Sequence, residues 1–399
     1  MIKISFMKIL VFFMLIFYFA QGISENISSS FAINNITFNT KLEKNFQDLK
    51  KVSSETSYDD IAKIIAGIPC SSSSLEKVQN SNVWKSFKKS IDNDWFELEA
   101  KRLQFINNWA YIELFAPNKK TELLFYPFGG PDCLTALQFF PNARNYILIG
   151  LEPVGNLPEV EKWKSQYMES YLEDLKFSVS DFFKRSYFIS KNMNKNLYSD
   201  KIDGVLPLIC FFLKRNGDKI IDIKRITFDE MGNDLEESYI TNVERYKRPY
   251  GIKISFSQES SGIKNIYYFS CDLSDKSFNK KSKFFLYLDK FDTMTVLIKD
   301  ASYLLHYKNY TMIRNFILNK SQFILQDDTG IPYRFLKDIN WELKLYGHYT
   351  KPVKDFSGVE QPDLANAYKA GNIEKLPFDL GYHWRENADA LMLIQRKVK

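Results

Sequence analysis

The chain lacks most of the motifs that identify common catalytic centres. Its 399 residues include four cysteines, none at CxxC spacing, which argues against a zinc ribbon or a thioredoxin-like redox motif. It has no G-x-S-x-G elbow, which disfavours an α/β-hydrolase, and no Walker loop for nucleoside triphosphates. It also has no RNA- or DNA-binding motif, and we expect no nucleic-acid partner.

Histidine is scarce as well, with three residues in the whole chain: His306, His348 and His383. All three lie in the C-terminal third in aromatic surroundings, without HxH or HExxH pairing. Their grouping raises the hypothesis of a metal or acid–base site, against the simpler interpretation of packed or surface side chains. A further hypothesis makes Cys133 a nucleophile, with a thiol pKa lowered at a helix start and His383 as its base.

Long apolar runs are also rare, and only Ile9–Ala20 (ILVFFMLIFYFA) is uninterrupted. Two lysines precede this run, and small residues two apart follow it. This arrangement is typical of an export signal, and the run is shorter than the roughly 20 residues of a membrane span. We therefore expect a cleaved signal at 1–23, a mature chain without a transmembrane segment, and an extracytoplasmic location, periplasmic or secreted.

An oxidising compartment permits disulfides, and four cysteines allow three pairings. Cys70, Cys133, Cys210 and Cys271 each lie within or beside an apolar segment. Free cysteine is among the most buried residue types, so buried thiols are expected at least as much as bridges.

Neither sign of charge dominates, because 54 Lys and Arg residues are nearly matched by 48 Asp and Glu residues. The one dense basic patch, at 276–283, is interpreted as an exposed loop rather than an anion site. Hydrophobic residues make up 45% of the chain, enough for a large core. We predict a loose arm at 24–56 and a single large domain at 57–399.

The order of expected elements predicts the fold class. Asn216-Gly217 between FFLKR and DKIIDIKRI predicts a hairpin, and Ser261-Gly262 predicts a second one. Helices are expected at Tyr58–Ile68, from Pro158 to about Leu197, and at Ala301–Asn319, and short strands at Phe284–Leu288, Met294–Ile298, Phe323–Gln326 and Ala390–Gln395. This pattern indicates an α/β fold: a mixed sheet with a Rossmann-like βαβ unit, an antiparallel hairpin region at about 205–290, and flanking helices.

The most informative segment, 122–158, predicts a strand, a glycine turn, a short helix and a second strand. Gly129 and Gly130 let a ligand approach the backbone closely, and free N–H groups there could bind an anion. Asp132 is expected to cap the helix, and Glu152 ends the second strand, where Rossmann-like folds hold ribose hydroxyls. These four are the predicted ligand-binding residues; the alternative is a tight turn beside a solvated strand end.

The layout of this segment is similar to the first βαβ unit of class I methyltransferases. The similarity is one of pattern, because the turn has no G-x-G, Pro131 follows the glycines, and the helix is short. It implies a nucleotide-like cofactor at the turn, although such cofactors are scarce outside the cytoplasm.

Asp327-Asp328-Thr329 forms a second candidate site. Adjacent carboxylates at the end of a strand lie where open α/β sheets bind ligands. They could hold a hard cation such as Ca²⁺ or Mg²⁺, or serve as acid and base. The alternative is an Asp-rich turn closed by Gly330.

Several longer segments suggest a family. YPFGGPD at 126–132 and GLEPVG at 150–155 resemble signatures of a family of uncharacterised exported bacterial proteins. SYLLH at 302–306, LQDDTGIPYRF at 325–335 and LPFDLGYHW at 376–384 are similar to segments of the same family. The resemblance implies export and a shared fold, and it implies no activity.

Three functional hypotheses follow. The first is a protein that binds a ligand or partner through the face at the glycine turn. The second is an extracytoplasmic hydrolase, with or without a metal, whose candidate catalytic residues are Asp132, Glu152, Asp327 and His383. The third is a methyltransferase-like enzyme. A pocket that places Glu152 beside the Gly129-Gly130 backbone would favour a nucleotide-type ligand, whereas scattered carboxylates and histidines would exclude the hydrolase.

Overall fold

The computed structural model describes residues 56–188, 202–236, 250–258, 262–337, 339–356, 358–383 and 389–397. These residues belong to one compact unit that begins at Thr56. The expected export signal at 1–23 and all but the last residue of the expected arm at 24–56 lie outside the described residues.

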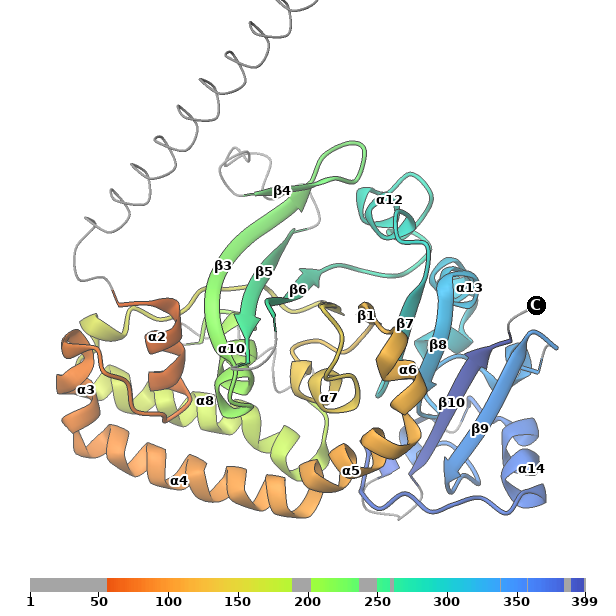
Figure 1. Cartoon of the computed structure of the whole chain (residues 1–399), viewed down its shortest axis with the longest axis horizontal. Helices are drawn as coiled ribbons and strands as arrows, with labels where there is room; N and C mark the ends of the chain where they lie inside the picture. The colour runs from red at the N-terminus through yellow and green to blue at the C-terminus, as the bar shows by residue number, and fades with distance from the viewer. Residues whose placement is uncertain are drawn as a thin grey trace, which may run out of the picture. The chain divides into compact units, whose positions relative to one another are not determined.

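The described residues form an α/β fold around a ten-stranded mixed sheet (Figure 1). The strand order is β4-β3-β5-β6-β2-β1-β7-β8-β10-β9. The five central strands, from β6 to β8, run parallel, and the strands on both sides of them pair antiparallel. The strands are β1 Leu123–Tyr126, β2 Asn145–Gly150, β3 Lys219–Phe228, β4 Asp234–Glu236, β5 Tyr250–Ser257, β6 Lys264–Ser270, β7 Met294–Ile298, β8 Ser321–Gln326, β9 Trp341–Gly347 and β10 Ala390–Arg396.

Helices cover both faces of the sheet. One core cluster joins the sheet to α2 Tyr58–Ile65, α3 Glu76–Asn80, α4 Asn82–Leu98, α5 Gln104–Glu113, α7 Cys133–Phe139, α8 Ser165–Arg185 and α10 Leu206–Arg215. The other cluster joins the opposite face to α12 Lys283–Asp289, α13 Thr311–Lys320 and α14 Pro362–Ala370. A short helix, α6 Phe115–Lys120, leads from α5 into β1. No helix among the described residues combines the length and apolar character that crossing a membrane requires.

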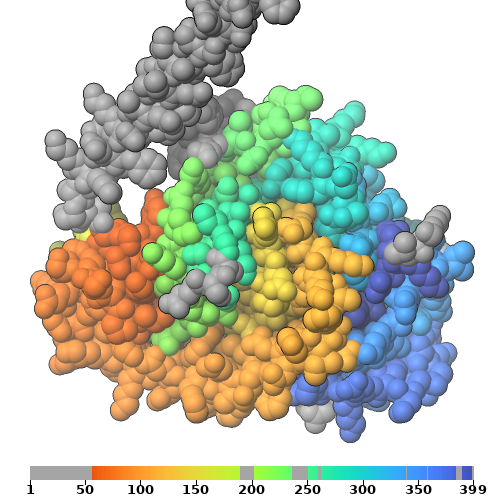
Figure 2. Space-filling view, viewed as in Figure 1, coloured from red at the N-terminus to blue at the C-terminus, as the bar shows by residue number. Residues whose placement is uncertain are grey.

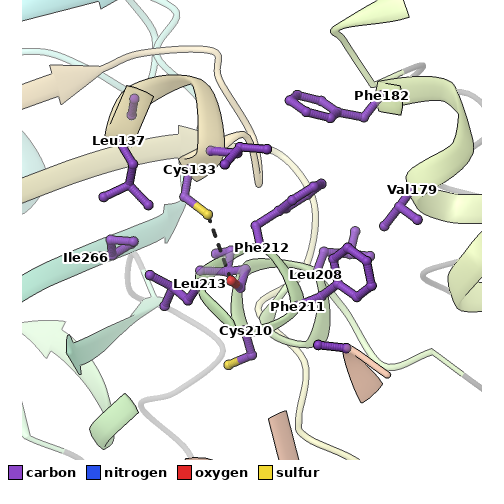
Figure 3. Packing of buried hydrophobic residues seen from close by; sticks show 14 of the residues in the cluster. Cys133, Leu137, Val179, Phe182, Leu208, Cys210, Phe211, Phe212, Leu213 and Ile266 are labelled. Carbon is purple, nitrogen blue, oxygen red and sulfur yellow. Dashed lines mark hydrogen bonds between the residues drawn. The ribbon is translucent and has the colours of Figure 1, made fainter. Parts of the chain in front are cut away.

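Strand β1, at the centre of the sheet, is continuously apolar. Leu124 and Tyr126 point into the first core cluster, whereas Leu123 and Phe125 point into the second. Successive side chains of a strand face opposite sides, so a strand covered by helices on both faces can bury every side chain in an apolar core. Figure 3 shows the first cluster between α7 and α10, where Cys133 and Cys210 lie among Phe211, Phe212 and Leu213.

Segments far apart in the sequence pack together at the lower edge of Figure 2, where residues coloured orange, from the N-terminal part of the described chain, meet residues coloured blue, from its C-terminal part. Trp109 on α5 packs edge-to-face on Tyr346 of β9, with ring centroids 4.9 Å apart. Glu113 accepts hydrogen bonds from Tyr346 and Lys344 of the same strand. Helix α5 therefore fixes the antiparallel end of the sheet to the first layer of helices.

Three predictions of local structure are wrong. FFLKR, predicted as a strand, ends the helix α10, and Asn216 caps this helix instead of turning a hairpin. Phe284–Leu288, also predicted as a strand, lies in α12, which Ser282 caps. Short apolar runs that are buried on all sides have no periodicity to separate helix from strand. The antiparallel region predicted at about 205–290 is therefore confined to β3–β6, between Lys219 and Ser270.

The helix predicted at Ala301–Asn319 is shorter, and α13 begins at Thr311 after two turns of 3₁₀ helix. Both β9 and α14 lie in a segment for which the sequence predicted no element. The antiparallel pairing of the second predicted hairpin is confirmed between β5 and β6, and Ser261 of its predicted turn lies outside the described residues. The βαβ unit is confirmed as β1-α7-β2, with the two strands parallel and adjacent. All four cysteines are free.

Candidate functional site

The carboxyl ends of the five central strands lie at one edge of the sheet. From β1 the chain adds β2 and β6 on one side, and it later places β7 and β8 on the other side. Open α/β sheets bind ligands at such a switch in direction, in the crevice outside the strand ends. A cavity of about 180 Å³ lies there, and its lining includes Phe128, Gly130, Asp132, Glu152, Asp300 and Tyr382.

The glycine turn forms one wall of this cavity. Phe128 has a φ of 64° and Gly130 a φ of 56°, both in the left-handed region. A bulky residue rarely adopts this conformation, so Phe128 marks a backbone that the surrounding structure holds under strain. Asp132 caps α7 as predicted, because its Oδ1 accepts the N–H of Thr135 at 3.0 Å.

The expected anion site at this turn is not formed. Gly130 donates its N–H to the carbonyl of Ile149 at 3.0 Å, and Asp132 donates to Gly129 at 3.1 Å. Cys133 donates to Pro131 at 2.7 Å, and the carboxylate of Asp132 itself occupies the start of α7. These N–H groups already have partners, and a carboxylate repels an anion, so the turn is poorly suited to a phosphate.

Glu152 forms a second wall, directly after β2. Its carboxylate folds back toward the strand end and accepts the N–H of Leu151 at 3.1 Å. A Cβ on Gly150 would lie 2.5 Å from Oε2 of Glu152, and one on Gly130 would lie 3.5 Å from it. The two glycines therefore make room for this carboxylate. Burial raises the pKa of Glu152, because the carboxylate has lost much of its hydration.

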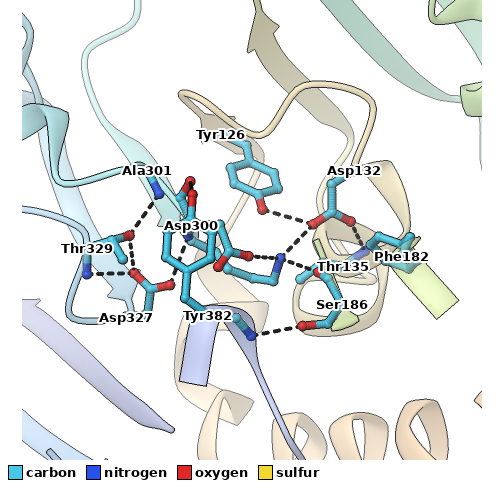
Figure 4. Close-up of polar contacts among 12 residues, drawn as sticks. Tyr126, Asp132, Thr135, Phe182, Ser186, Asp300, Ala301, Asp327, Thr329 and Tyr382 are labelled. Atoms are coloured by element: carbon cyan, nitrogen blue, oxygen red, sulfur yellow. Dashed lines mark hydrogen bonds and ion pairs between the residues drawn. The ribbon is translucent and has the colours of Figure 1, made fainter. Parts of the chain in front are cut away.

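Lys299, which follows β7 and also lines the cavity, joins three segments through its ammonium. Its ammonium donates to Asp132 Oδ2 at 3.2 Å, to Asp300 Oδ2 at 2.5 Å and to the carbonyl of Ser186 at 2.6 Å. Tyr126 donates its hydroxyl to the same oxygen of Asp132 at 3.0 Å (Figure 4). We call Asp132, Lys299 and Asp300 the buried triad; their side chains are 3%, 2% and 9% exposed.

The charges within the triad do not balance. Burial lowers the pKa of Lys299, but Asp300 and Asp132 outweigh burial and the net shift is upward. Burial raises the pKa of Asp300 to about 6, although Lys299 opposes that rise. Oδ1 of Asp300 is buried and has no hydrogen-bond partner among the described residues. One ammonium thus serves two carboxylates, and Asp300 keeps an unused acceptor.

The backbone after the triad is strained. Asp300, Ser302 and Tyr303 have φ values of 55°, 48° and 54°, and none of them is a glycine. Asp327 and Thr329 hold this segment, because Asp327 accepts the N–H of Asp300 at 2.9 Å and Thr329 Oγ1 accepts that of Ala301 at 2.8 Å. Such strain persists where surrounding contacts fix it, and it gathers at functional sites.

Asp327 and Asp328 therefore have structural partners. Asp327 also accepts the N–H and hydroxyl of Thr329, at 2.9 and 2.5 Å, and Asp328 accepts the hydroxyl of Tyr303. Burial, with repulsion by Asp300 and Asp328, raises the pKa of Asp327. No group of three or more potential metal-ligand side chains occurs among the described residues. The metal site at Asp327 and Asp328 stays a prediction without support from their contacts.

The histidines do not join this site. Neither His306 nor His348 lines the cavity at the glycine turn, and the side chain of His383 lies outside the described residues. Burial lowers the pKa of His306 to about 4, so this imidazole is neutral near pH 7. Cys133 is fully buried, with Sγ 3.8 Å from the carbonyl of Ile209. Burial raises its thiol pKa, and the hypothesis of a lowered pKa is wrong.

The structure brings together all four predicted ligand-binding residues, Gly129, Gly130, Asp132 and Glu152. Of the catalytic candidates, Asp132 and Glu152 line the cavity, and Asp327 stands behind it. The prediction missed the Lys299-Asp300 pair, which follows the short strand β7. The rule that singled out Glu152, a charged residue at the end of a buried strand, would have found this pair too.

Aromatic rings complete the lining of the cavity. Phe128, Tyr187, Phe188 and Tyr382 lie around it, and Tyr187 and Tyr382 meet edge-to-face with centroids 4.9 Å apart. Tyr382 donates its hydroxyl to the carbonyl of Asp300 at 2.8 Å, which ties this ring to the strained segment. Among the lining residues, three carboxylates face a single ammonium, and the cavity is therefore electronegative.

Comparison with protein-family models, with curated proteins and with solved structures finds no match to this chain. The resemblance to a family of uncharacterised exported proteins therefore stays a prediction.

Proposed function

We propose that the cavity at the glycine turn binds a small organic cation that carries vicinal hydroxyls, of which a nucleoside sulfonium such as S-adenosylmethionine is the type. The observation that carries this proposal is the lining of the cavity, in which three carboxylates and four aromatic rings accompany a single, fully engaged ammonium. Aromatic faces and carboxylates both attract a cation, and an electronegative pocket repels an anion.

Each wall has a role in this proposal. Glu152 lies beside the Gly130 backbone at the end of β2, the position from which an acidic residue holds ribose hydroxyls. Asp300 and the rings of Phe128 and Tyr382 stabilise the positive group. Within the buried triad, Lys299 holds the carboxylates of Asp300 and Asp132 in place, so the cavity needs little reorganisation when the ligand enters.

The same lining disfavours dinucleotides and nucleoside triphosphates. The N–H groups of Gly130, Asp132 and Cys133 have partners within the chain, and Lys299 is committed to the triad. A phosphate would therefore find neither free amides nor a free cation at the turn. At about 180 Å³ the cavity is smaller than the usual range for drug-sized ligands, so part of a nucleoside sulfonium would extend beyond it.

A second candidate function is methyl transfer, and the sheet order favours it. The five parallel strands occur along the chain in the order β1, β2, β6, β7, β8. When they are numbered 1 to 5 in that order, their positions across the sheet read 3-2-1-4-5, as in a doubly wound sheet. The last strand, β10, is antiparallel and lies between β8 and β9. This arrangement is similar to that of class I methyltransferases, which use a nucleoside sulfonium. The hydrolase hypothesis has less support, because the described side chains place no histidine at the cavity.

The proposal is tested by thermal shift on the full chain with S-adenosylmethionine, S-adenosylhomocysteine, adenosine and ATP. A ligand that binds only the folded state raises the melting temperature. We expect S-adenosylmethionine to give the largest rise, adenosine a smaller one, and ATP none. Equal shifts with ATP and S-adenosylmethionine, or no shift with any compound, would contradict the proposal.

Two variants separate the roles of the walls. Glu152→Gln should weaken binding of both adenosine and S-adenosylmethionine, because both present ribose hydroxyls. Asp300→Asn should weaken only S-adenosylmethionine, because it removes the charge that faces the cation. Glu122→Gln is the matched control, since this side chain is 78% exposed at the other end of β1.

A further inference from the structure

A second cavity, of about 460 Å³, lies between the loop after β2 and the first turns of α8. Its lining includes Asn156, Glu159, Trp163, Tyr167, Tyr171 and Asp203. It shares no lining residue with the cavity at the glycine turn. We call it the aromatic cavity.

Close backbone packing holds one rim of the aromatic cavity. Asn156 donates its backbone N–H to the carbonyl of Asp203 at 3.0 Å, and its side-chain amide donates to Oδ2 of Asp203 at 2.5 Å. Gly155 and Gly204 make this approach possible, because a Cβ on Gly155 would lie 1.6 Å from the carbonyl oxygen of Asp203. The amide and carboxylate at the rim are therefore fixed before any ligand arrives.

Three contacting rings form the opposite wall. The ring of Tyr171 lies 5.0 Å from that of Trp163 and 6.3 Å from that of Tyr167, between centroids. Tyr171 is 1% exposed, whereas Tyr167 is 42% exposed. The rings are tilted against one another, by 43° between Trp163 and Tyr171 and by 35° between Tyr167 and Tyr171. The wall is thus a faceted apolar surface that begins in solvent and ends in the core, and small-molecule sites use aromatic walls of this kind for an apolar ligand face.

Two hydrogen-bonding groups on this wall lack partners. The indole N–H of Trp163 and the hydroxyl of Tyr171 are both shielded from solvent and have no hydrogen-bond partner among the described residues. Buried Trp and Tyr side chains usually find a partner for these groups. The described residues therefore leave two donors on adjacent rings of one cavity without an acceptor, and a ligand oxygen can supply one.

The charges around the aromatic cavity cancel. The lining contains two acidic residues, Glu159 and Asp203, and two basic residues, Lys162 and Lys164. Glu159 forms an ion pair with Lys162 at 2.9 Å. Neither an anion nor a cation is favoured by this balance. The amide oxygen of Asn156 already accepts a hydrogen bond from Arg225. The lining therefore offers carboxylate oxygens as acceptors and two ring groups as donors, so it suits a neutral ligand with many hydroxyls.

We propose that the aromatic cavity is a saccharide site, which takes the apolar face of a pyranose ring against Trp163 and Tyr167. The C–H groups of such a ring form an apolar face, and its hydroxyls project from the edge toward Asn156 and Asp203. The ring and hydroxyl oxygens accept from Trp163 and Tyr171. This site is independent of the function proposed for the glycine turn.

The test is saturation-transfer NMR and calorimetry on the full chain with glucose, N-acetylglucosamine, maltose and cellobiose. We expect at least one saccharide to bind, and Tyr167→Ala to abolish the binding by removing the exposed part of the wall. Tyr171→Phe removes one hydrogen bond, and we expect it to weaken binding roughly tenfold. The same change should leave the melting temperature unchanged or higher, because it removes an unsatisfied buried hydroxyl.

Matched variants keep this test decisive. Tyr111→Ala removes a tyrosine that is 78% exposed on α5, and it should not affect saccharide binding. Glu152→Gln should not affect it either, because Glu152 lines the other cavity. The proposal is overturned if no saccharide binds the wild type, or if binding survives both Tyr167→Ala and Tyr171→Phe.

Discussion

Replacing Lys299 with methionine removes the ammonium from a side chain that is only 2% exposed. Asp132, Asp300 and the carbonyl of Ser186 then lose a shared donor. Removing one partner from a buried ion pair costs about 3–5 kcal/mol, because the remaining charge stays buried without compensation. Tyr126 and Thr135 still donate to Asp132, so we expect most of the loss to arise at Asp300.

The loss should depend on pH. With Lys299 present, burial already raises the pKa of Asp300 to about 6, above the value of about 3.9 in an unfolded chain. Without Lys299 this pKa rises further. A carboxyl whose pKa is higher in the folded state stabilises the fold at low pH, and this contribution disappears as the pH rises through the folded pKa. The difference in the free energy of unfolding between wild type and Lys299→Met should therefore become smaller as the pH falls from about 8 toward 5.

The assay is urea denaturation of the full chain across this pH range, with Lys101→Met as the matched control. Lys101 forms an ion pair with Glu97 in which the side chains are 73% and 67% exposed. Such a pair contributes little, and we expect the control to change the free energy of unfolding by less than about 1 kcal/mol at every pH. The proposed role of the buried triad would be refuted if Lys299→Met lowered the free energy of unfolding by no more than the control does. It would also be refuted if the loss of free energy became larger as the pH falls.

Three further predictions concern the cavity and the core. Gly150→Ala should cost about 1–3 kcal/mol of stability and prevent ligand binding, because the new methyl would meet the Glu152 carboxylate at 2.5 Å. Gly262→Ala, where nothing lies within 4 Å, should leave both unchanged in the same denaturation and thermal-shift assays. Affinity for S-adenosylmethionine, measured by calorimetry, should rise as the pH increases through about 6, because Asp300 then loses its proton and attracts the cation. Cys133 should resist thiol reagents until the chain unfolds, and modification of Cys133 in native protein, detected by mass spectrometry, would contradict its burial.

Part of the site was predictable, because open α/β sheets bind ligands outside the carboxyl ends of their strands and charged residues there are candidate ligand contacts. Gly129, Gly130, Asp132 and Glu152 follow two buried strands whose apolar runs are evident in the sequence. The parallel pairing of these strands brings the four residues to one cavity. That part of the prediction needed only short-range patterns and the geometry of a βαβ unit.

The rest of the site depends on long-range contacts that leave no local pattern. Lys299 reaches Asp132 and Ser186, which are 167 and 113 residues away in the sequence. The positive φ values of Asp300, Ser302 and Tyr303 occur without glycine. The backbone N–H groups of Asp300 and Ala301 hold this segment by donating to Asp327 and Thr329. No single window of sequence contains this information.

The errors in the fold have a related cause. The apolar runs in α10 and α12 are buried on nearly every side, so their hydrophobic pattern matches a strand as well as a helix. Strand β9, in contrast, alternates the apolar Trp341, Leu343 and Leu345 with Glu342 and Lys344, a period of two that indicates a half-buried strand and that the prediction overlooked. Packing, not local propensity, decides the structure of α10 and α12.

The most direct test of the central claim is a crystal structure of the full chain with S-adenosylmethionine. We expect electron density for the ligand at the carboxyl ends of β1, β2 and β7. The ribose hydroxyls should lie within hydrogen-bond distance of Glu152, and the sulfonium should face Asp300 and the surrounding rings. An empty cavity at a saturating ligand concentration, or a ligand held only at another surface, would contradict the account.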